Sequence, residues 1–543
     1  MAGLDLSYHE SEMSGGAMKV LVADPIADEG VALLRAQAGL EVAIDLGLAE
    51  SQLCERVADC EAIIVRSATQ ITATVLQSAP RLKVVGRAGI GVDNIDVDAA
   101  TERGVVVLNT PDANATTTAE LTVAHILSLS RHLPSADRSM RAGEWKRSKF
   151  VGTELAGKTL GIIGYGTIGR IVAARCQGLT MHVMAFDPFV TKEVLEADGI
   201  EPRELDQLLS EADYVSLHCP VTEKTRGLIN TERIAAMKRG ARLINCARGG
   251  IVDEAALLAA LHRGHLAGAA LDVYEREPPT DSPLLEQDNV VLTPHLGAST
   301  EEAQVAVGVA IARQVVAFLD HGEAINAVNI PHVPFEELHR IQPYQHLASR
   351  LGHLLSALVP GPLEQLEVAL YGRAAEVDPH LIAVEALVGL LQERMSTPVN
   401  RVNACHLAKR QGISLLESRS AETHDYLSLM MVKGTYGTEV TTLLGTLLGE
   451  RHPRLVRIDD YEVESVPEGT LLLTRHDDRP GVVGALGNLL GRSNVNISRM
   501  QVGVAPDSEK AIAVIGISAP LSAELLRQVE AIPAVETVCQ VTF

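Results

Sequence analysis

The sequence predicts an α/β protein built on parallel sheets, with a small ferredoxin-like domain at its C-terminal end. From Met18 onward, short apolar runs alternate with stretches of helical periodicity, and a glycine-rich turn joins a buried strand to a helix near residue 164. Residues 468–543 follow the order strand, helix, strand, strand, helix, strand. The alternation is typical of parallel sheets with crossover helices, and the last order is that of a ferredoxin-like domain.

Length and composition indicate a soluble, cytoplasmic protein of three or four domains. The 543 residues exceed what one hydrophobic core organises. The net charge of −22, without a long basic run, argues against nucleic acid or an anionic membrane as partner. The seven scattered cysteines predict reduced thiols and no metal site. No apolar run spans a bilayer, and residues 1–17 are too acidic and polar for a signal peptide.

The first sheet is expected from the strands KVLVAD, VAIDL, AIIVRS and KVVGRAG, separated by helices at residues 29–37 and 50–59. A short helix at residues 116–133 should follow. Later strands are DYVSLH, ARLINCA, AGAALDV and NVVLTPH, and polar residues stand at their ends, where open α/β sheets bind ligands. A long helix at residues 301–321 is expected to return the chain to the first sheet, and the irregular stretch 324–336 suits a domain boundary.

The segment from residue 160 to 187 predicts a dinucleotide site. Gly164 permits a tight turn after the strand 160–163, Gly166 lets the backbone approach a pyrophosphate, and Gly169 permits close packing of helix on strand. The helix at residues 168–177 directs free N–H groups at the phosphates. Asp187 follows the strand 182–186, where a carboxylate accepts the ribose hydroxyls of NAD and repels the 2′-phosphate of NADP. A glycine turn without a ligand is the alternative.

Residues 160–298 resemble the D-2-hydroxyacid dehydrogenases. The matches are Arg248 in NCARGGIVDE, Glu277 in LDVYEREPP and His295 in LTPHLGAST. The resemblance implies a Rossmann-type nucleotide-binding domain inserted in a flavodoxin-like substrate domain, followed by an α/β intervening domain and a ferredoxin-like ACT domain. The expected divisions are a tail at 1–17, the substrate domain at 18–116 and 301–332, the NAD-binding domain at 117–300, the intervening domain at 333–467 and the ACT domain at 468–543.

By this resemblance, NAD is the cofactor, and its site combines the glycine loop with residues at several strand ends. The expected cofactor-binding residues are Ile90, Gly164, Gly166, Thr167, Ile168, Gly169, Asp187, Cys219, Cys246, Ala247, Arg248, Asp272, His295, Leu296, Gly297 and Ala298.

The three matched polar residues suit the oxidation of a secondary alcohol. His295 is expected to accept the hydroxyl proton when hydride leaves. Glu277 would hold the other ring nitrogen, as a buried carboxylate does in a hydrolase triad. Arg248 would bind the substrate carboxylate and polarise the reacting oxygen. The alternatives are that Arg248 pairs with Asp272, that His295 is a core histidine, and that Glu277 faces water.

Arg66 in VRSAT and Arg87 in VGRAGIGVDNID resemble the phosphoglycerate dehydrogenase branch of the family. By this resemblance they bind the substrate 3-phospho-D-glycerate together with Arg248 and His295, and the product is 3-phosphohydroxypyruvate, in the first step of phosphorylated L-serine synthesis. The alternative for the two arginines is an ion pair with Asp93 or Asp96. Another D-2-hydroxy acid, such as glycerate, lactate or 2-hydroxyglutarate, and a nucleotide-sensing corepressor on the same fold are the competing functions.

Two further segments imply partners. Trp145, Lys146, Arg147 and Lys149 form a basic and aromatic cluster that in resembling enzymes reaches toward the neighbouring subunit's active site in a dimer; a solvated charged face is the alternative. A homodimer or homotetramer is the expected assembly. HDDRPGVVG and NVNIS resemble the ACT domain, so His476, Asp478 and Asn496 are expected to bind L-serine as an effector, whereas a plain turn at Asp478 is the alternative. Residues 451–457 hold an arginine and histidine cluster, for which a plain surface role is favoured.

Overall fold

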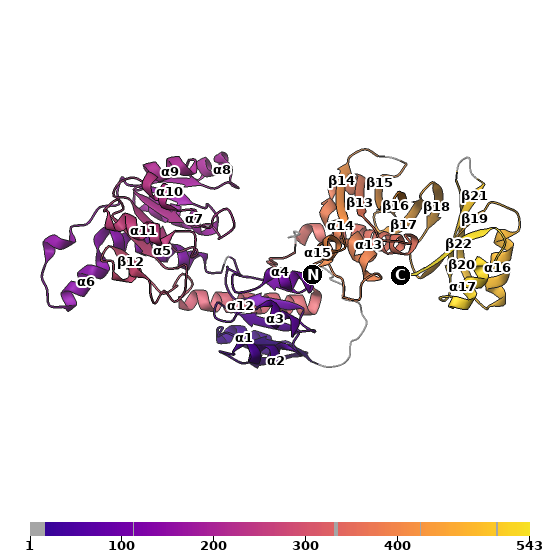
Figure 1. The fold of residues 1–543 in the computed structure, drawn as a ribbon, viewed down its shortest axis with the longest axis horizontal. Coiled ribbons are helices and arrows are strands. Elements are labelled where there is room, and N and C mark those ends of the chain that lie inside the picture. Colours follow the sequence, from indigo (N-terminus) through magenta and orange to yellow (C-terminus); the bar gives the residue numbers. More distant parts are fainter. Residues whose placement is uncertain (1–16, 112, 331–334, 424, 506–508) are drawn as a thin grey trace.

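The computed structural model describes residues 17–330 except 112, together with 335–543 except 424 and 506–508. The expected tail and the expected boundary at residues 332–333 therefore lie outside the described residues, apart from residue 17. Four sheets are present in the described part of the chain. Figure 1 shows them spread along the long axis of the molecule, with the second sheet at one end and the fourth at the other.

The first lobe is a parallel sheet in the order β2-β1-β3-β4-β5, the flavodoxin-like order. One face packs on α1 and α12 and the other on α2, α3 and α4. The strands are β1 Met18–Val22, β2 Leu40–Ile44, β3 Ala62–Val65, β4 Val84–Arg87 and β5 Val106–Leu108. The helices are α1 Asp28–Ala36, α2 Glu50–Val57, α3 Ala73–Gln77, α4 Val97–Glu102 and α12 Glu301–His321.

The second lobe is a parallel sheet of seven strands in the order β12-β11-β10-β9-β6-β7-β8. The strands are β6 Thr159–Ile163, β7 His182–Phe186, β8 Glu201–Pro202, β9 Tyr214–Leu217, β10 Arg242–Asn245, β11 Gly268–Leu271 and β12 Val290–Leu292. The helices are α5 Ala115–Arg131, α6 Leu133–Arg141, η1 Arg147–Phe150, α7 Thr167–Gly178, α8 Lys192–Ala197, α9 Leu205–Glu211, α10 Thr231–Ala236, α11 Glu254–His262 and η2 Pro283–Glu286. Because the chain leaves β6 toward β7 and later returns to β9 on the other side, the ligand-binding switch point lies between β6 and β9.

The helix expected at residues 116–133 is found as α5, shifted by one residue at its start and two at its end. It spans the 17 residues Ala115–Arg131 and ends where His132 takes a left-handed conformation at φ 53°. The chain then turns directly into α6, which projects from the second lobe (Figure 1).

Helix α12 returns the chain to the first lobe. By length and composition it is apolar enough to cross a membrane. Val307, Ile311, Val315 and Phe318 are nevertheless buried against the first sheet, so α12 is a core helix of this lobe.

The third domain is a mixed six-stranded sheet in the order β14-β13-β15-β16-β17-β18. Its strands are β13 Gln365–Gly372, β14 Ser414–Ser420, β15 Ser428–Tyr436, β16 Glu439–Leu448, β17 His452–Ile458 and β18 Tyr461–Ser465, and its helices are α13 Phe335–Leu358, η3 Arg373–Glu376, α14 Pro379–Gln392 and α15 Ala404–Arg410. The domain is attached to the first lobe, because Asn400 donates to the carbonyl of Gly104 at 3.0 Å and Val402 is buried in the first lobe's core.

The fourth domain has the expected ferredoxin-like order, with an antiparallel sheet β20-β21-β19-β22. Its elements are β19 Thr470–Asp477, α16 Val482–Arg492, β20 Ile497–Val504, β21 Lys510–Ile517, α17 Ala523–Glu530 and β22 Val535–Thr542. The helices cover one face of the sheet, whereas Leu471, Leu473 and Val514 on the other face join the core of the third domain.

Candidate active site

A side chain would have a different effect at each of the three glycines after β6. Gly164 adopts φ 96°, and a Cβ there would lie 2.6 Å from the carbonyl oxygen of His218. A Cβ on Gly169 would lie 2.3 Å from the carbonyl oxygen of Gly164, whereas a Cβ on Gly166 would meet no atom within 4 Å. Gly164 and Gly169 therefore allow strand and helix to pack closely, and Gly166 leaves open space in front of the helix, where a pyrophosphate fits.

The start of α7 is suited to an anion. Thr167 and Ile168 form its first turn, and Gly166 supplies no side-chain cap, so the first N–H groups remain available. Asp187, at the end of β7, accepts hydrogen bonds from Tyr165 N and Phe189 N, each at 2.8 Å. These bonds hold the carboxylate beside the glycine loop.

The other expected cofactor residues lie on both lobes. Cys219 follows β9, Cys246 and Ala247 follow β10, and Ile90 lies on the first lobe, after β4. Burial raises the pKa of the Cys219 thiol to about 11 and that of Cys246 to about 12. Both thiols are therefore protonated at neutral pH and are not activated nucleophiles.

His295 and Glu277 form a hydrogen-bonded pair. Nδ1 of His295 lies 2.8 Å from Oε2 of Glu277, while Oε1 of Glu277 accepts from Tyr274 N at 3.1 Å. The hydrogen bond to Glu277 raises the pKa of His295 against the lowering effect of burial. Burial raises the pKa of Glu277, but the hydrogen bond and charge of His295 outweigh it and the net direction is downward. The arrangement fixes the ring and directs its other nitrogen to proton transfer.

The loop carrying His295 is held by the fully buried Asp272. His295 itself has a left-handed backbone, at φ 56°, which is strained for a residue other than glycine. Asp272 accepts from Leu296 N at 2.7 Å and Gly297 N at 2.9 Å, and its carbonyl accepts from His295 N at 3.0 Å. The carboxylate and the carbonyl of Asp272 together accept three backbone N–H groups of this bend. Asp272 therefore bonds to the loop that carries His295 and not to an arginine.

The sequence offered no signal for the residues behind this bend. Thr293 donates to Asp272 at 2.6 Å, and Nε2 of the buried His125 lies 3.0 Å from the same hydroxyl. Thr118 donates to the carbonyl of Gly297 at 2.7 Å. Burial lowers the pKa of His125, so its ring is neutral and can donate to Thr293.

Arg248 contacts the opposite lobe. Its Nε donates to Oδ2 of Asp93 at 3.0 Å and its Nη1 to the carbonyl of Ala247 at 2.6 Å. The alternative of a pair with Asp272 is therefore wrong. No ion pair of Arg66 or Arg87 with Asp93 or Asp96 is found among the described residues, where Asp93 bonds to Arg248 and Asp96 caps α4 by accepting from Ala99 N.

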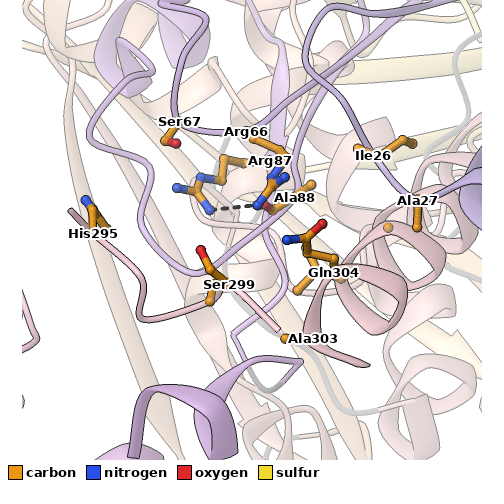
Figure 2. A pocket seen from close by; sticks show the side chains of 13 residues that line it. Ile26, Ala27, Arg66, Ser67, Arg87, Ala88, His295, Ser299, Ala303 and Gln304 are labelled. Atoms are coloured by element: carbon orange, nitrogen blue, oxygen red, sulfur yellow. Dashed lines mark hydrogen bonds between the residues drawn. The ribbon is translucent and has the colours of Figure 1, made fainter. Parts of the chain in front are cut away.

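Arg66 and Arg87 line one pocket with His295, Ser299 and Gln304. Figure 2 shows the two arginine side chains next to each other, with His295 at the opposite side. The hydrogen bonds found for their side chains in the described part of the chain go to the carbonyls of Pro25 and Ala88, not to acids. Burial, followed by the charge of Arg248, lowers the pKa of Arg87 to about 10. Two unpaired guanidinium groups at one end of a pocket suit a multiply charged anion.

Family models match three successive parts of the chain. Residues 123–297 match the NAD binding domain of the D-isomer specific 2-hydroxyacid dehydrogenases, residues 340–459 the D-3-phosphoglycerate dehydrogenase intervening domain, and residues 470–534 the ACT domain. The D-3-phosphoglycerate dehydrogenase of Methanocaldococcus jannaschii is 40% identical over 527 residues, which cover 97% of this chain and 100% of that protein. The enzyme of Bacillus subtilis is 39% identical over 520 residues, or 96% and 98% of the two chains.

The chain belongs to the D-3-phosphoglycerate dehydrogenase family. Its first two lobes also resemble solved structures of D-2-hydroxyacid dehydrogenases. A D-lactate dehydrogenase of Aquifex aeolicus, crystallised with NAD and lactic acid, aligns at a TM-score of 0.52 and 32% identity, over 58% of this chain and 100% of its own. A Thermus thermophilus protein aligns at 0.53 and 38% identity, over 57% and 100%. The nucleotide-binding lobe of this phosphoglycerate dehydrogenase family member is therefore an NAD-binding domain.

The ACT domain of this family member does not bring its three expected effector residues together within one chain. His476 lies at the end of β19 and Asp478 follows it, beside the start of β21. Asn496 precedes β20, whose first residue pairs with Ile517 at the other end of β21. At about 3.3 Å per residue, the two groups lie roughly 20 Å apart along the sheet. His476 is buried, with Nδ1 on the carbonyl of Asp477 at 3.0 Å, and its Nε2 has no hydrogen-bond partner among the described residues, which leave out 506–508 of the adjacent loop.

Proposed function

We propose that this protein oxidises 3-phospho-D-glycerate to 3-phosphohydroxypyruvate with NAD, the first step of phosphorylated L-serine synthesis. The observation that carries the proposal is the shared pocket of Arg66, Arg87 and His295. His295, a proton acceptor, lies on one side of this pocket, and Arg66 and Arg87, for which the described residues provide no ion-pair partner, lie on the other.

His295 is the proposed proton acceptor. With Glu277 on Nδ1, the neutral ring presents Nε2 to the substrate hydroxyl and takes its proton as the carbon is oxidised. Glu277 then stabilises the imidazolium that forms, as the carboxylate of a hydrolase triad does.

Arg248 is proposed to bind the substrate carboxylate and the reacting oxygen. Asp93 and the carbonyl of Ala247 engage its Nε and Nη1, so the Nη2 donors are the ones assigned to the substrate. Such a donor typically contributes about 3 kcal/mol to the transition state. The phosphate is assigned to Arg66 and Arg87.

The chain's own residues fit the cofactor. The open space at Gly166, the uncapped start of α7 and the carboxylate of Asp187 are the proposed contacts for pyrophosphate and ribose, with the strand-end residues from Ile90 to Ala298 around the nicotinamide end. When bound, NAD supplies the hydride acceptor.

The test is NAD reduction, followed by nicotinamide absorbance, with 3-phospho-D-glycerate, D-glycerate, D-lactate and 2-hydroxyglutarate as substrates. We expect kcat/KM to be highest for the phosphorylated acid. A higher value for one of the other acids would move the assignment to that substrate, and no reduction with any of them would contradict an enzymatic function and favour the corepressor.

We further propose a soluble, cytoplasmic homodimer or homotetramer that binds L-serine between two ACT domains. His476 and Asp478 would come from one chain and Asn496 from its neighbour, because the sheet separates them within a chain. Within the described residues Nε2 of the buried His476 has no hydrogen-bond partner, which supports a ligand at this end of the sheet. Exposed Trp145, with Lys146, Arg147 and Lys149 in the segment that follows α6, is the proposed contact with the neighbouring subunit.

Subunit complementation tests the shared effector site. Asp478→Ala and Asn496→Ala should each abolish inhibition by L-serine, while co-expressed chains should regain part of it, because one site in each mixed pair keeps both residues. Inhibition that does not return in mixed oligomers would contradict a site between chains, and a monomer in sedimentation analysis would contradict the assembly.

A further inference from the structure

The loop that carries Arg66 is fixed from both sides by residues outside it. Asp24 Oδ2 accepts from Arg66 N at 2.6 Å and from Thr69 N at 3.1 Å, and its Oδ1 accepts from the Thr69 hydroxyl at 2.8 Å. On the other side, Asn94 Nδ2 donates to the carbonyl of Arg66 at 2.8 Å and to that of Thr69 at 2.6 Å. Asp24 and Asn94 therefore hold the backbone donors and acceptors of residues 66–69 in one geometry.

The hydrogen bonds between Asp24 and the Arg66 loop lie at the ligand-binding edge of the first sheet. Asp24 follows β1 and Arg66 follows β3, and the chain leaves β1 toward β2 before it returns to β3 on the other side. The two residues thus stand on either side of the switch point of the first sheet, where open α/β sheets bind their ligands. Asp24 is only 3% exposed, and a buried carboxylate is stable where its oxygens accept several hydrogen bonds.

Arg66 needs this support, because its own side chain is weakly anchored. Among the described residues, its guanidinium makes one long hydrogen bond, 3.4 Å to the carbonyl of Pro25. It shares a pocket with Arg87, and two like charges in one pocket repel each other until an anion arrives. The place of the guanidinium is consequently set by the backbone of residues 66–69.

We propose that Asp24 is a positioning residue for phosphate recognition. Through the N–H of Arg66 and both donors of Thr69, it holds the Arg66 loop where the guanidinium faces Arg87, and so it determines how tightly the phosphorylated end of the substrate binds. Asp24 itself does not touch the substrate. This inference rests on the proposed function and adds a residue to it.

The test compares Asp24→Ala with Asp24→Asn in the full-length protein. Asp24→Ala should raise KM for 3-phospho-D-glycerate about tenfold or more, the effect of losing charged hydrogen bonds, with kcat and KM for NAD within about twofold of wild type. Asp24→Asn should recover most of this loss, because the amide oxygen can accept both N–H groups while its NH₂ donates to the Thr69 hydroxyl.

Glu61 is the matched control. It is also a carboxylate of 3% exposure that accepts a backbone N–H, from Lys19, and it precedes β3, at the opposite edge of the same sheet. Glu61→Ala should destabilise the lobe without changing KM for the phosphorylated substrate. Equal KM changes in the Glu61→Ala and Asp24→Ala variants would overturn the proposal, and so would an Asp24→Asn variant as impaired as Asp24→Ala.

Asn94→Ala is a second variant that tests whether the Arg66 loop must be held in place, and it can be used if Asp24→Ala does not fold. It releases the loop from the carbonyl side and should raise the same KM with kcat preserved; an unchanged KM would again contradict the proposal. If wild-type protein does not turn over 3-phospho-D-glycerate, the proposed function itself fails. Normal wild-type turnover with unchanged KM in the variants removes only the role of Asp24.

Discussion

Arg248 of the NAD-binding lobe and Asp93 of the first lobe are joined by a 3.0 Å hydrogen bond across the cleft. The two residues are 155 positions apart in the chain. The bond orients the guanidinium before a substrate is present, which reduces the entropy lost when a carboxylate binds. It also means that the fork of Arg248 depends on the backbone near Asp93.

Gly91→Ala should therefore impair catalysis more than stability. A Cβ at this position would lie 2.0 Å from Nη2 of Arg248, which is the end of a flexible side chain and can move away. We expect kcat/KM to fall about 100-fold, the cost of losing one transition-state donor, with a melting temperature close to that of wild type. A variant with normal turnover would show that the position of Arg248 is not critical.

The glycine loop allows binding and stability to be separated. Gly166→Ala places its methyl group in open space and should fold normally while weakening NADH binding at least about tenfold, a loss of ~1.4 kcal/mol. Gly169→Ala places the methyl group 2.3 Å from a backbone oxygen and should destabilise the protein by about 1–3 kcal/mol. Gly178→Ala, at the far end of the same helix with no atom within 4 Å, is the control. Titration of nicotinamide fluorescence and thermal melting give the two readouts, and equal NADH affinity for Gly166→Ala and Gly178→Ala would contradict a pyrophosphate at Gly166.

The pH dependence of oxidation should report the pair of His295 and Glu277. Oxidation needs the neutral ring, so kcat/KM should rise as pH increases through the pKa of His295, which Glu277 raises above the usual 6.5. Glu277→Gln removes the charge that favours the imidazolium, and the acidic limb of the profile should move to lower pH while the plateau falls. A limb that stays in place would mean that another group is titrating.

His295→Ala should lower kcat by at least about 100-fold, because general-base catalysis of this kind contributes at least that much. NADH binding should persist, since the glycine loop and Asp187 are untouched. Stopped-flow turnover together with equilibrium NADH binding checks both statements. Turnover near the wild-type rate would sink the proton-transfer assignment.

Local patterns were sufficient to predict the fold class. The strand expected at residues 182–186 is β7, the helix expected at 168–177 is α7 to within a residue at each end, and the C-terminal strand and helix order is found as expected. These features depend on neighbours in the sequence: apolar runs, glycines at fixed spacing and a carboxylate at a strand end.

Contacts between distant residues were not predictable in this way. The bond of Arg248 with Asp93, and the support of Arg66 by Asp24, join residues that no sequence period relates. The left-handed backbone of His295 is likewise imposed by Asp272 from the preceding strand. The separation of Asp478 from Asn496 required the register of β20 and β21, which a list of strands does not contain.

Val402, a residue of the third domain, completes the hydrophobic core of the first lobe. Nearby, the side-chain amide of Asn400 donates a hydrogen bond to the carbonyl of Gly104, where the chain turns at φ 72°. The Aquifex aeolicus enzyme aligns with 58% of this chain, whereas here a residue of the third domain contributes to the first-lobe core. Removing the third domain would expose the part of this core that Val402 covers, so we expect the first two lobes alone to melt at a lower temperature than the full-length protein.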